Sequence, residues 1–554
     1  MNMKKVVTIK VLLIVALAVV STSCKKSSSS KNSSRATGWN INDRDGGFQY
    51  NTEFKEQETS PGLVFIEGGT FTKGRVQDDV MHDWNNSPNQ QHVMSFYMDE
   101  TEVTNAMYLE YLDYLKRYYP PSEDNFKAIY NGALPDTLVW RNRLGYNEVM
   151  TENYLRHPAY GEYPVVGVSW IQAVEFSNWR TDRVNELNLS QAGYREINHT
   201  DIDPDNAFNT NRYTIDPSSM DTGEPVDSRR NRNITVDAEG NESGIYASRE
   251  TGVLAPKYRL PTEVEWEYAA LGLSEIRSYN LYRGRKKYPW DGQYTRSGKR
   301  KIRGDQMANF KQGKGDYGGI AGWSDDGADI TNAVKSYAPN DFGLYDMAGN
   351  VAEWVADVYR PIIDDQFNDF NYYRGNVYTK NAINEDGSVK VITSDEIVYD
   401  TLSNGKIIAR NLPGEIMQVP VDENETFQRT NFDKSNEINF RDGDKRSSRK
   451  FESFGDEDEE SGKSSGMYNS PKHNISRDSL GNIVREYDKS NNRTSLINDE
   501  VRVYKGGSWK DREYWLDPAQ RRYFPQDMAT DYIGFRCAMS RVGSKSKGGN
   551  KTKN

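Results

Sequence analysis

Cysteine is nearly absent from this sequence. Cys24 and Cys537 are the two cysteines among 554 residues. If Cys24 is modified, as its surroundings indicate below, Cys537 has no partner within the mature chain. An intramolecular disulfide is then excluded, even in an oxidising compartment.

Histidine is scarce as well, and the motifs of common hydrolases are missing. The five histidines form no HExxH or other paired metal motif. The segment GVSW does not have the form of a nucleophile elbow, and we interpret its Ser169 as a helix cap. No pair of acidic residues can be assigned to glycoside chemistry from the sequence.

Long apolar runs are also missing, and the N-terminal run is short. Basic MNMKK precedes VVTIKVLLIVALAVV, which is too short to span a membrane and contains Lys10. STSC then places small residues before Cys24, as in a bacterial lipobox, although Ser21 stands where Leu is usual. This pattern predicts a lipoprotein signal peptide over 1–23 and lipidation of Cys24. The alternative is a plain secretory signal followed by an incidental cysteine.

An excess of positive charge is missing too. The formal charge is −10, and it becomes −13 once residues 1–23, with three lysines and no acid, are removed. An acidic chain argues against nucleic acid as a partner and against attachment to anionic lipid by charge alone. The two lysines after Cys24 do not resemble an acidic surface-export signal. We therefore expect a lipid-anchored protein of the outer membrane that faces the periplasm.

Composition divides the chain into folded and polar stretches. Serine and lysine dominate the region after Cys24, and two long inner stretches are poor in aliphatic residues, which is typical of tethers and surface insertions. Within the second of these, we expect 440–495 to be the least ordered part. The predicted segments are a flexible tether 24–60, a body 61–359 with an insertion at about 190–255, a partly disordered polar insertion 360–499, a closing part 500–541 and a basic disordered tail 542–554.

Local signals mark the beginnings of strands and helices. GLVFIEGGTFTKG predicts two strands around a Gly-Gly turn. Thr104, Ser169 and Thr262 each precede a run with helical periodicity, and Thr262 forms a T-x-x-E capping box with Glu265. The face of the first helix that is predicted to enter the core consists of Met107, Tyr108, Tyr111, Leu112 and Leu115.

Seven motifs follow one another along the chain. They are EVTNAMY, PVVGVSW, YRLPTEVEWEYAA, YPW, NDFGLYDMAGNVAEW, KGGSW and IGFR. Together they resemble the formylglycine-generating enzyme (sulfatase-modifying factor) family over about 61–359 and 500–541. The resemblance implies an α+β fold. It would be a formylglycine-generating-enzyme-like domain, related to C-type lectins, with little regular secondary structure and two large polar insertions.

The lipobox-like start and the long insertion before KGGSW narrow the resemblance further. With them the chain resembles the gliding-motility lipoproteins of the Bacteroidetes, which are linked to gliding and to type 9 protein secretion. Two sister lipoproteins of that apparatus share the domain, and the longer chain and the insertion favour one of them over the other. The implied partners are envelope proteins of this machinery, with the related lipoprotein GldK among them, and the membrane through the lipid on Cys24.

The residues that carry the family's chemistry are missing. The resemblance implies that active members oxidise a substrate cysteine with two cysteines of their own, which bind copper and closely follow the GGS-aromatic motif. Asp511 and Leu516 stand at these positions. Neither can act as a thiolate ligand for Cu(I), so we expect no copper, no catalytic residues and no enzyme of this kind. Cys537 is expected to be a buried core thiol.

The resemblance also implies structural calcium. Asn, Asp and Glu side chains and backbone carbonyls are the oxygen ligands that Ca²⁺ prefers. The alternative is that these residues only cap turns. The predicted ligands are, for a first site, the side chains of Asn309 and Asp326 with the carbonyls of Phe310 and Ala328, and, for a second site, the side chains of Asn350 and Glu353 with the carbonyls of Gly349 and Val351.

Three functions fit these observations. The first is a non-catalytic structural component of the envelope machinery, whose former active-site groove, lined by Trp509, Tyr514 and Trp515, holds a partner peptide. A core role for Trp509 is the alternative within this hypothesis. The second is an enzyme of the same fold that uses unrecognised residues. The third is a carbohydrate- or peptide-binding module.

Overall fold

The computed structural model describes a body within 56–554 and, separately, a short unit within 1–55. In the short unit, Ser33 and Asn40 form an antiparallel bridge. None of the described helices is long and apolar enough to cross a membrane. The predicted signal peptide and Cys24 lie outside the described residues. These are 33–34, 36–41, 43, 48, 57–74, 85–141, 147–194, 197, 202–217, 220, 247, 249–273, 286–290, 294–312, 326–361, 378–421, 473–477, 483–487 and 497–543.

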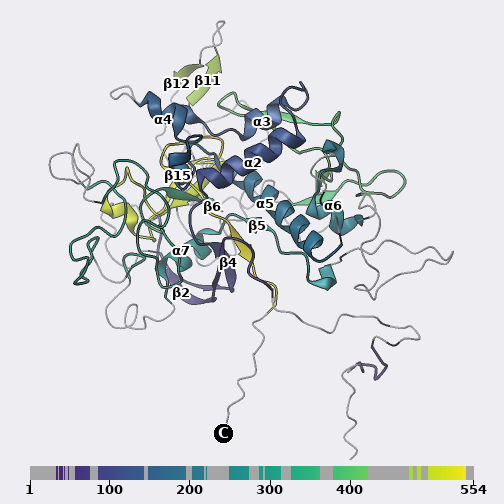
Figure 1. Ribbon diagram of the computed structural model, residues 1–554, viewed down its shortest axis with the longest axis horizontal. Helices are drawn as coiled ribbons and strands as arrows, with labels where there is room; N and C mark the ends of the chain where they lie inside the picture. The colour runs from purple at the N-terminus through teal and green to yellow at the C-terminus, as the bar shows by residue number, and fades with distance from the viewer. Residues whose placement is uncertain are drawn as a thin grey trace, which may run out of the picture. The chain divides into compact units, whose positions relative to one another are not determined.

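Two four-stranded sheets form the centre of the body (Figure 1). Each sheet joins the closing segment of the chain to strands from much earlier in the sequence. The fold therefore depends on contacts between residues that are distant in sequence. The first sheet is antiparallel and has the order β1 (Leu63–Ile66), β4 (Phe96–Asp99), β16 (Ala538–Ser540), β5 (Tyr258–Arg259). The second has the order β14 (Arg522–Pro525), β13 (Val501–Lys505), β6 (Ala352–Val358), β15 (Ile533–Gly534), and β15 runs parallel to β6.

Short elements complete the mixed α+β fold that the sequence predicts, with modest regular secondary structure. Four antiparallel pairs are β2 (Gly69–Lys73) with β3 (Asn89–Val93), β7 (Thr379–Asn381) with β10 (Gln418–Pro420), β8 (Tyr399–Thr401) with β9 (Ile407–Ala409), and β11 (His473–Arg477) with β12 (Ile483–Tyr487). The α-helices are α2 (Asn105–Tyr118), α3 (Lys127–Ala133), α4 (Glu148–Asn153), α5 (Trp170–Gln191), α6 (Thr210–Ile215) and α7 (Glu263–Leu271). Short 3₁₀ turns span Thr137–Trp140, Pro158–Tyr160, Pro204–Asn206, Arg249–Thr251 and Glu513–Leu516.

The predicted caps begin three of these helices. The side chain of Thr104 accepts a backbone hydrogen bond at the start of α2. Ser169 with Gln172 and Thr262 with Glu265 form complete capping boxes at α5 and α7. Each cap satisfies backbone N–H groups that have no partner within the helix. The two strands predicted around the Gly-Gly turn are also confirmed as β1 and β2.

The predicted core face of α2 is correct except at its first residue. Tyr108 and Tyr111 are buried and their rings pack 5.7 Å and 5.8 Å from the ring of Phe176 on α5, which lies beside α2 in Figure 1. Met107 is 36% exposed, so its assignment to the core is wrong. Successive helical residues are rotated by about 100°, which turns Met107 away from the stripe that Tyr108 begins.

Part of the predicted polar insertion 360–499 is folded. Within 378–421 the strand pairs β7–β10 and β8–β9 form, and Ile408 and Ile416 are buried. A Cβ added to Gly132 of α3 would lie 3.2 Å from the carbonyl oxygen of Ile407. This close approach shows that the insertion packs against α3. Apart from β11 and β12, the stretch 440–495 lies outside the described residues.

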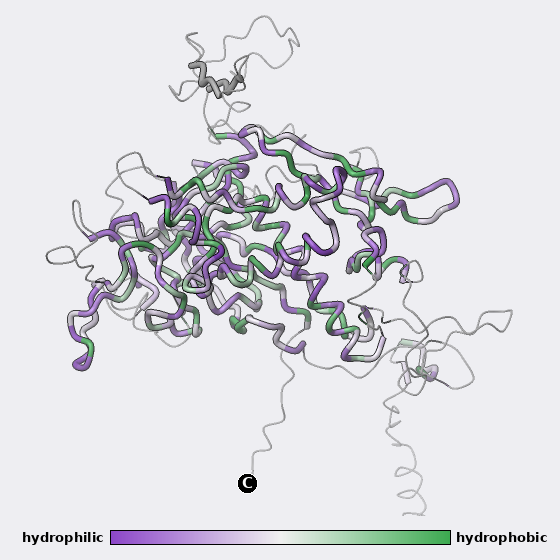
Figure 2. Tube along the Cα trace, turned by 45° about the horizontal axis from the view of Figure 1, so that its top comes forward, coloured by the Kyte–Doolittle hydropathy of each residue, from purple (hydrophilic) through white to green (hydrophobic). Residues whose placement is uncertain are grey.

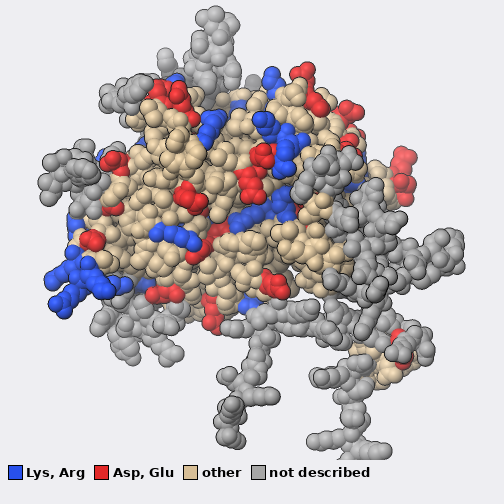
Figure 3. Space-filling model, in the orientation of Figure 1, with Lys and Arg blue, Asp and Glu red and all other residues tan. Residues whose placement is uncertain are grey.

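The surface of the body is polar and mixed in charge. Hydrophilic stretches lie at the loop tips and hydrophobic stretches run through the interior of the trace in Figure 2. Lysine, arginine and acidic side chains are interspersed on the face drawn in Figure 3. On this face, side chains of both charges are therefore mixed.

A buried ion pair joins the two central sheets. Arg536 and Glu353 are fully or almost fully buried, and their two hydrogen bonds measure 2.6 Å and 2.7 Å. The same guanidinium donates to the carbonyl oxygens of Asp99 and Tyr345 at 3.2 Å and 2.8 Å. The indole of Trp266 on α7 donates to Glu353 at 2.8 Å. The Arg536–Glu353 pair therefore connects both sheets, α7 and a loop.

A second buried network lies beside the first. Glu263 and Glu267 on α7 pair with basic side chains from β2, β13 and the start of β14. The pairs are Lys73–Glu263 at 3.2 Å, Lys505–Glu263 at 3.3 Å, Lys505–Glu267 at 3.0 Å and Arg521–Glu263 at 2.6 Å. These cations hold the pKa of Glu263 below its usual value despite its burial.

Loss of Glu353 is expected to destabilise the fold strongly. Glu353→Ala leaves the Arg536 guanidinium buried without its counter-charge, which costs about 3–5 kcal/mol of unfolding free energy. Urea unfolding of the full chain measures this loss. Arg141→Ala is the matched control, because it breaks the Arg141–Glu148 pair, whose side chains are 56% and 39% exposed, and should leave the midpoint unchanged. Similar midpoints for both variants would contradict the role of the buried pair.

Candidate functional site

The turn after β13 has a backbone conformation that is strained for residues other than glycine. Gly506 and Gly507 have φ values of 97° and 71°. A Cβ on Gly506 would lie 3.1 Å from the Trp266 ring, and one on Gly507 would lie 2.8 Å from the carbonyl oxygen of Trp515. Both positions therefore require glycine. The turn presents the residues that follow it, where the family resemblance places the two cysteines.

Asp511 stands at the first of these positions and is held in an ion pair. Its carboxylate oxygens accept two hydrogen bonds from Arg522 at 2.5 Å and 2.6 Å. Ser508 donates a further hydrogen bond at 2.6 Å. The Arg522 guanidinium lies 4.6 Å from the centre of the Trp515 ring, over its face. Asp511 thus ties the loop to β14.

Leu516 stands at the second position and belongs to the core. Its exposure is 0%, and it packs in a cluster with Tyr288, Trp290, Ala308 and Phe310. An aliphatic side chain in an apolar cluster offers no ligand to a metal ion. The two positions together do not fit copper, because neither supplies the soft sulfur ligand that Cu(I) prefers.

The one described cysteine is buried away from this turn. Cys537 is 0% exposed, and its Sγ lies 3.4 Å from the Ser177 hydroxyl oxygen. Burial raises the pKa of its thiol to about 12, so it remains protonated at neutral pH. The prediction of a core thiol is confirmed.

The three residues predicted to line a groove differ in exposure. Trp509 is 5% exposed, stacks on Trp140 at 6.0 Å and donates its indole N–H to the carbonyl oxygen of Asp531. Its assignment to a groove is therefore wrong, because its ring fills the core, and the alternative is confirmed. Tyr514 and Trp515 are partly exposed and contact each other edge to face at 4.9 Å.

Of the first predicted calcium set, the side chains of Asn309 and Asp326 lie against the same loop segments. The Asp326 carboxylate accepts from the backbone N–H groups of Phe310 and Ala328 at 3.1 Å and 3.3 Å. The Asn309 side chain is buried beside them and donates to the carbonyl oxygen of Ile330 at 2.7 Å. These contacts aim N–H groups, not carbonyl oxygens, at the carboxylate, and binding of Ca²⁺ by this set stays a prediction. The same hydrogen bonds also cap the turn, as the alternative predicts.

The second predicted calcium set is not brought together. Asn350 has a φ of 57°, and its side chain donates to Glu102 at 2.8 Å and accepts from the backbone N–H of Asn332 at 2.8 Å. Glu353 is paired with Arg536 instead. A guanidinium at the carboxylate disfavours a further cation there, so Asn350, Glu353 and the carbonyls of Gly349 and Val351 do not fit calcium.

A cavity of about 120 Å³ lies elsewhere in the body, and sequence reasoning missed it. Its lining includes Glu175 on α5 and Glu415 in the folded part of the insertion. Burial raises the pKa of Glu175 to about 7. The positive charge of Lys406 lowers this pKa, and the negative charge of Glu415 raises it. Burial also raises the pKa of Glu415 to about 7. The sequence offered one signal for this cavity: Glu175 is an acidic residue next to Phe176, on the side of α5 that enters the core.

Three comparisons place these observations among known proteins. The sulfatase-modifying factor enzyme 1-like domain matches residues 49–394 and 422–541. A formylglycine-generating enzyme of Thermomonospora curvata is 40% identical over 100 residues, which are 18% of this chain and 27% of that protein. An inactive C-alpha-formylglycine-generating enzyme 2 of Mus musculus is 36% identical over 108 residues, 19% and 28% of the two chains. This chain thus spans about a quarter of the length of each relative.

A solved structure resembles the chain more broadly but more weakly. Variable protein 1 of Treponema denticola has a TM-score of 0.33 and 16% identity, covering 86% of this chain and 94% of that one. The domain match leaves out 395–421, which includes β8, β9 and Glu415.

Added calcium is expected to stabilise the chain through the first set. Ca²⁺ raises the thermal unfolding midpoint, because a ligand that binds only the folded state shifts the equilibrium toward it. Asp326→Asn removes most of this shift, measured by calorimetry with and without a chelator. Asp329→Asn, an exposed residue of the same loop, retains it. An equal shift in both variants would rule out a site at Asp326.

The raised pKa of Glu175 is expected to make stability depend on pH. The folded state binds this proton more tightly than the unfolded state, so the contribution to stability is present below about pH 4 and is lost as pH rises through about 7. Glu175→Gln should therefore lose less stability between pH 5.5 and pH 8 than the wild type, by on the order of 2 kcal/mol. Urea titrations at the two pH values measure this. Glu110 is exposed on α2, so Glu110→Gln should show the same pH dependence of stability as the wild type. If Glu175→Gln also showed the wild-type pH dependence, the raised pKa of Glu175 would be refuted.

Proposed function

The chain belongs to the sulfatase-modifying factor family, and we propose that it is a non-catalytic lipoprotein of the bacterial gliding-motility and type 9 secretion machinery, similar to the gliding-motility lipoprotein GldJ. In this role it supplies a rigid body and binding surfaces to an envelope assembly.

The proposal that the chain is non-catalytic rests on Asp511 and Leu516, which stand where the family resemblance implies two cysteines. Asp511 is engaged by Arg522 and Ser508, and Leu516 is fully buried. Restoring a reactive pair would require breaking a bidentate ion pair and opening an apolar cluster. A relative that is itself named an inactive enzyme gives further support.

The sequence around Cys24 supports the envelope part of the proposal. A lipid on Cys24 would hold the protein in the outer membrane, and the tether up to residue 60 would let the body extend into the periplasm. The folded segment 378–421, most of which the domain match omits, adds a surface to the common framework. Partners would be envelope proteins of the machinery, with GldK among them.

Two other functions would give different results. A carbohydrate- or peptide-binding module would be retained on its ligand in the absence of any motility protein. An enzyme of the same fold would convert a substrate with residues other than Asp511 and Leu516.

Loss of the lipid is expected to abolish the function without unfolding the body. In a gliding bacterium that lacks its own copy, the chain with Cys24→Ala should leave the membrane fraction and fail to restore colony spreading. Ser27→Ala, in the same tether, should restore both membrane attachment and spreading. Cell fractionation and spreading assays measure the two effects. Full spreading with the soluble Cys24→Ala chain would contradict a lipid-anchored role.

A further inference from the structure

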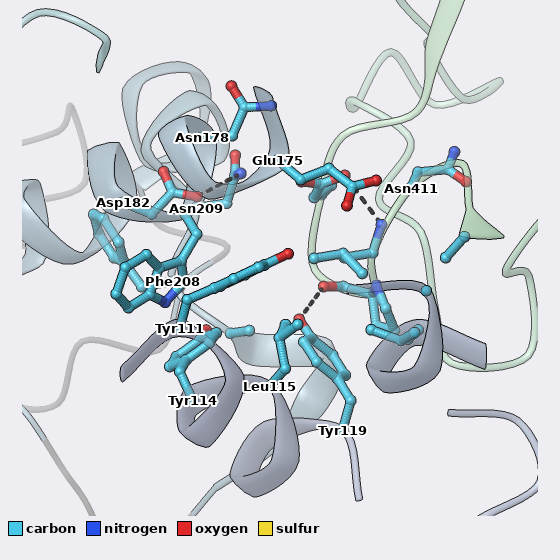
Figure 4. A pocket seen from close by; sticks show the side chains of 18 of the residues that line it. Tyr111, Tyr114, Leu115, Tyr119, Glu175, Asn178, Asp182, Phe208, Asn209 and Asn411 are labelled. Atoms are coloured by element: carbon cyan, nitrogen blue, oxygen red, sulfur yellow. Dashed lines mark hydrogen bonds between the residues drawn. The ribbon is translucent and has the colours of Figure 1, made fainter. Parts of the chain in front are cut away.

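The cavity of about 120 Å³ lies between α2, α5, the segment around Phe208 and the folded insertion. Figure 4 shows side chains from these elements converging on it. The wall formed by 408–415 lies in the stretch that the domain match omits. The cavity is therefore built partly from residues that are not part of the common family pattern.

Aromatic rings form much of its lining. Tyr111 lies 5.3 Å from Trp179, and Tyr114 lies 6.2 Å from the same indole, measured between ring centroids. Tyr119 and Phe208 also line the cavity and are 2% and 3% exposed. The faces of such rings carry partial negative charge and attract cations.

Polar atoms inside the cavity lack partners among the described residues. Tyr111 is 3% exposed. Its hydroxyl points into the cavity in Figure 4 and forms no hydrogen bond with the described residues. The side-chain oxygens of Asn178 and Asn411 are also unpaired within the described chain, but their amides point away from the centre of the cavity in Figure 4. The Tyr111 hydroxyl can accept a hydrogen bond from a ligand. Buried acceptors without donors are costly unless a ligand or water supplies the donors.

The charge inside the cavity is negative. Of the lining cations, Arg183 is paired with Glu186 at 2.5 Å and Arg410 with Asp400 at 2.7 Å. Glu175 forms no hydrogen bond or ion pair with any described residue, and its pKa is raised by burial.

Lys406 is the neighbouring cation that opposes the charge of Glu175, and burial outweighs its effect on the pKa of Glu175. Lys406 donates to the carbonyl oxygen of Leu134 at 2.7 Å. Glu415 accepts a backbone hydrogen bond from Leu412 at 3.0 Å. Asp182 accepts from the backbone N–H of Thr210 at 2.8 Å. The cavity thus combines aromatic walls, the Tyr111 hydroxyl and a carboxylate that has no hydrogen-bond or ion-pair partner among the described residues.

We propose that this cavity binds a small organic cation, namely an alkylammonium group such as the end of a lysine side chain or a free primary amine. The ammonium would donate to Glu175 and to the Tyr111 hydroxyl, and its alkyl stem would lie against the rings. An organic cation suits the site better than a metal ion, because no cluster of three or more metal-ligating side chains occurs in the described part of the chain. The volume approaches that of a cavity of about 150 Å³ that holds benzene, so roughly five or six heavy atoms fit.

Isothermal titration calorimetry of the purified full chain at pH 8 tests the proposal, since Glu175 is then ionised. The probe is n-butylammonium, and 1-butanol is a neutral molecule of the same size. The ammonium should bind with a dissociation constant of about 1 mM or below. The alcohol should bind at least about tenfold more weakly, because it lacks the charge and two of the donors.

Variants locate the binding. Glu175→Gln should weaken binding of n-butylammonium at least about tenfold, and Tyr111→Phe should weaken it by a few fold while keeping the ring. Glu110→Gln, on the exposed side of α2, should bind like the wild type. Circular dichroism shows whether each variant is folded, and Tyr111→Phe remains informative if Glu175→Gln is perturbed.

Two results would overturn the proposal: no heat from n-butylammonium, or equal binding of the ammonium to wild type and Glu175→Gln. Equal affinity for 1-butanol would overturn it as well, because it would indicate a merely apolar cavity. Nα-acetyl-lysine methylamide separates the sources of the cation. Tighter binding than that of n-butylammonium assigns the site to a lysine side chain, and weaker binding assigns it to a free amine.

Discussion

The fold depends on the buried pair of Arg536 and Glu353. Arg536 lies just before β16 of the first sheet, and Glu353 lies on β6 of the second, so their ion pair fixes the two sheets against each other. The remaining donors of the guanidinium go to carbonyl oxygens, which leaves little unsatisfied polarity. A buried charge pair of this kind specifies one arrangement, because any displacement leaves two charges without compensation.

The residues after the KGGSW turn are those at which the family resemblance implies two cysteines. In this chain Asp511 is paired with Arg522 and Leu516 is buried in an apolar cluster, so both positions serve the structure. The Tyr111 hydroxyl and the Glu175 carboxylate, which form no hydrogen bond within the described residues, lie in the cavity against the insertion. We propose that this cavity, rather than the KGGSW turn, is the binding site of the framework.

Much of the fold was predictable because its signals are local. Capping boxes at Ser169 and Thr262 depend on residues three positions apart, and they appear as expected. The cavity was not predictable, since Glu175 and Glu415 are brought together by packing of the insertion against α3 and α5, and no motif links them. Trp509 and Glu353 were assigned wrongly for a similar reason: their partners, Trp140 and Arg536, are distant in sequence.

We propose that this chain is a binding component of an envelope assembly. The most direct test is a pull-down of the tagged full chain from native membranes in mild detergent, followed by quantitative mass spectrometry. We expect stoichiometric recovery of gliding-motility or type 9 secretion components. Recovery of the chain alone, or with only scattered substrates or glycans, would contradict it.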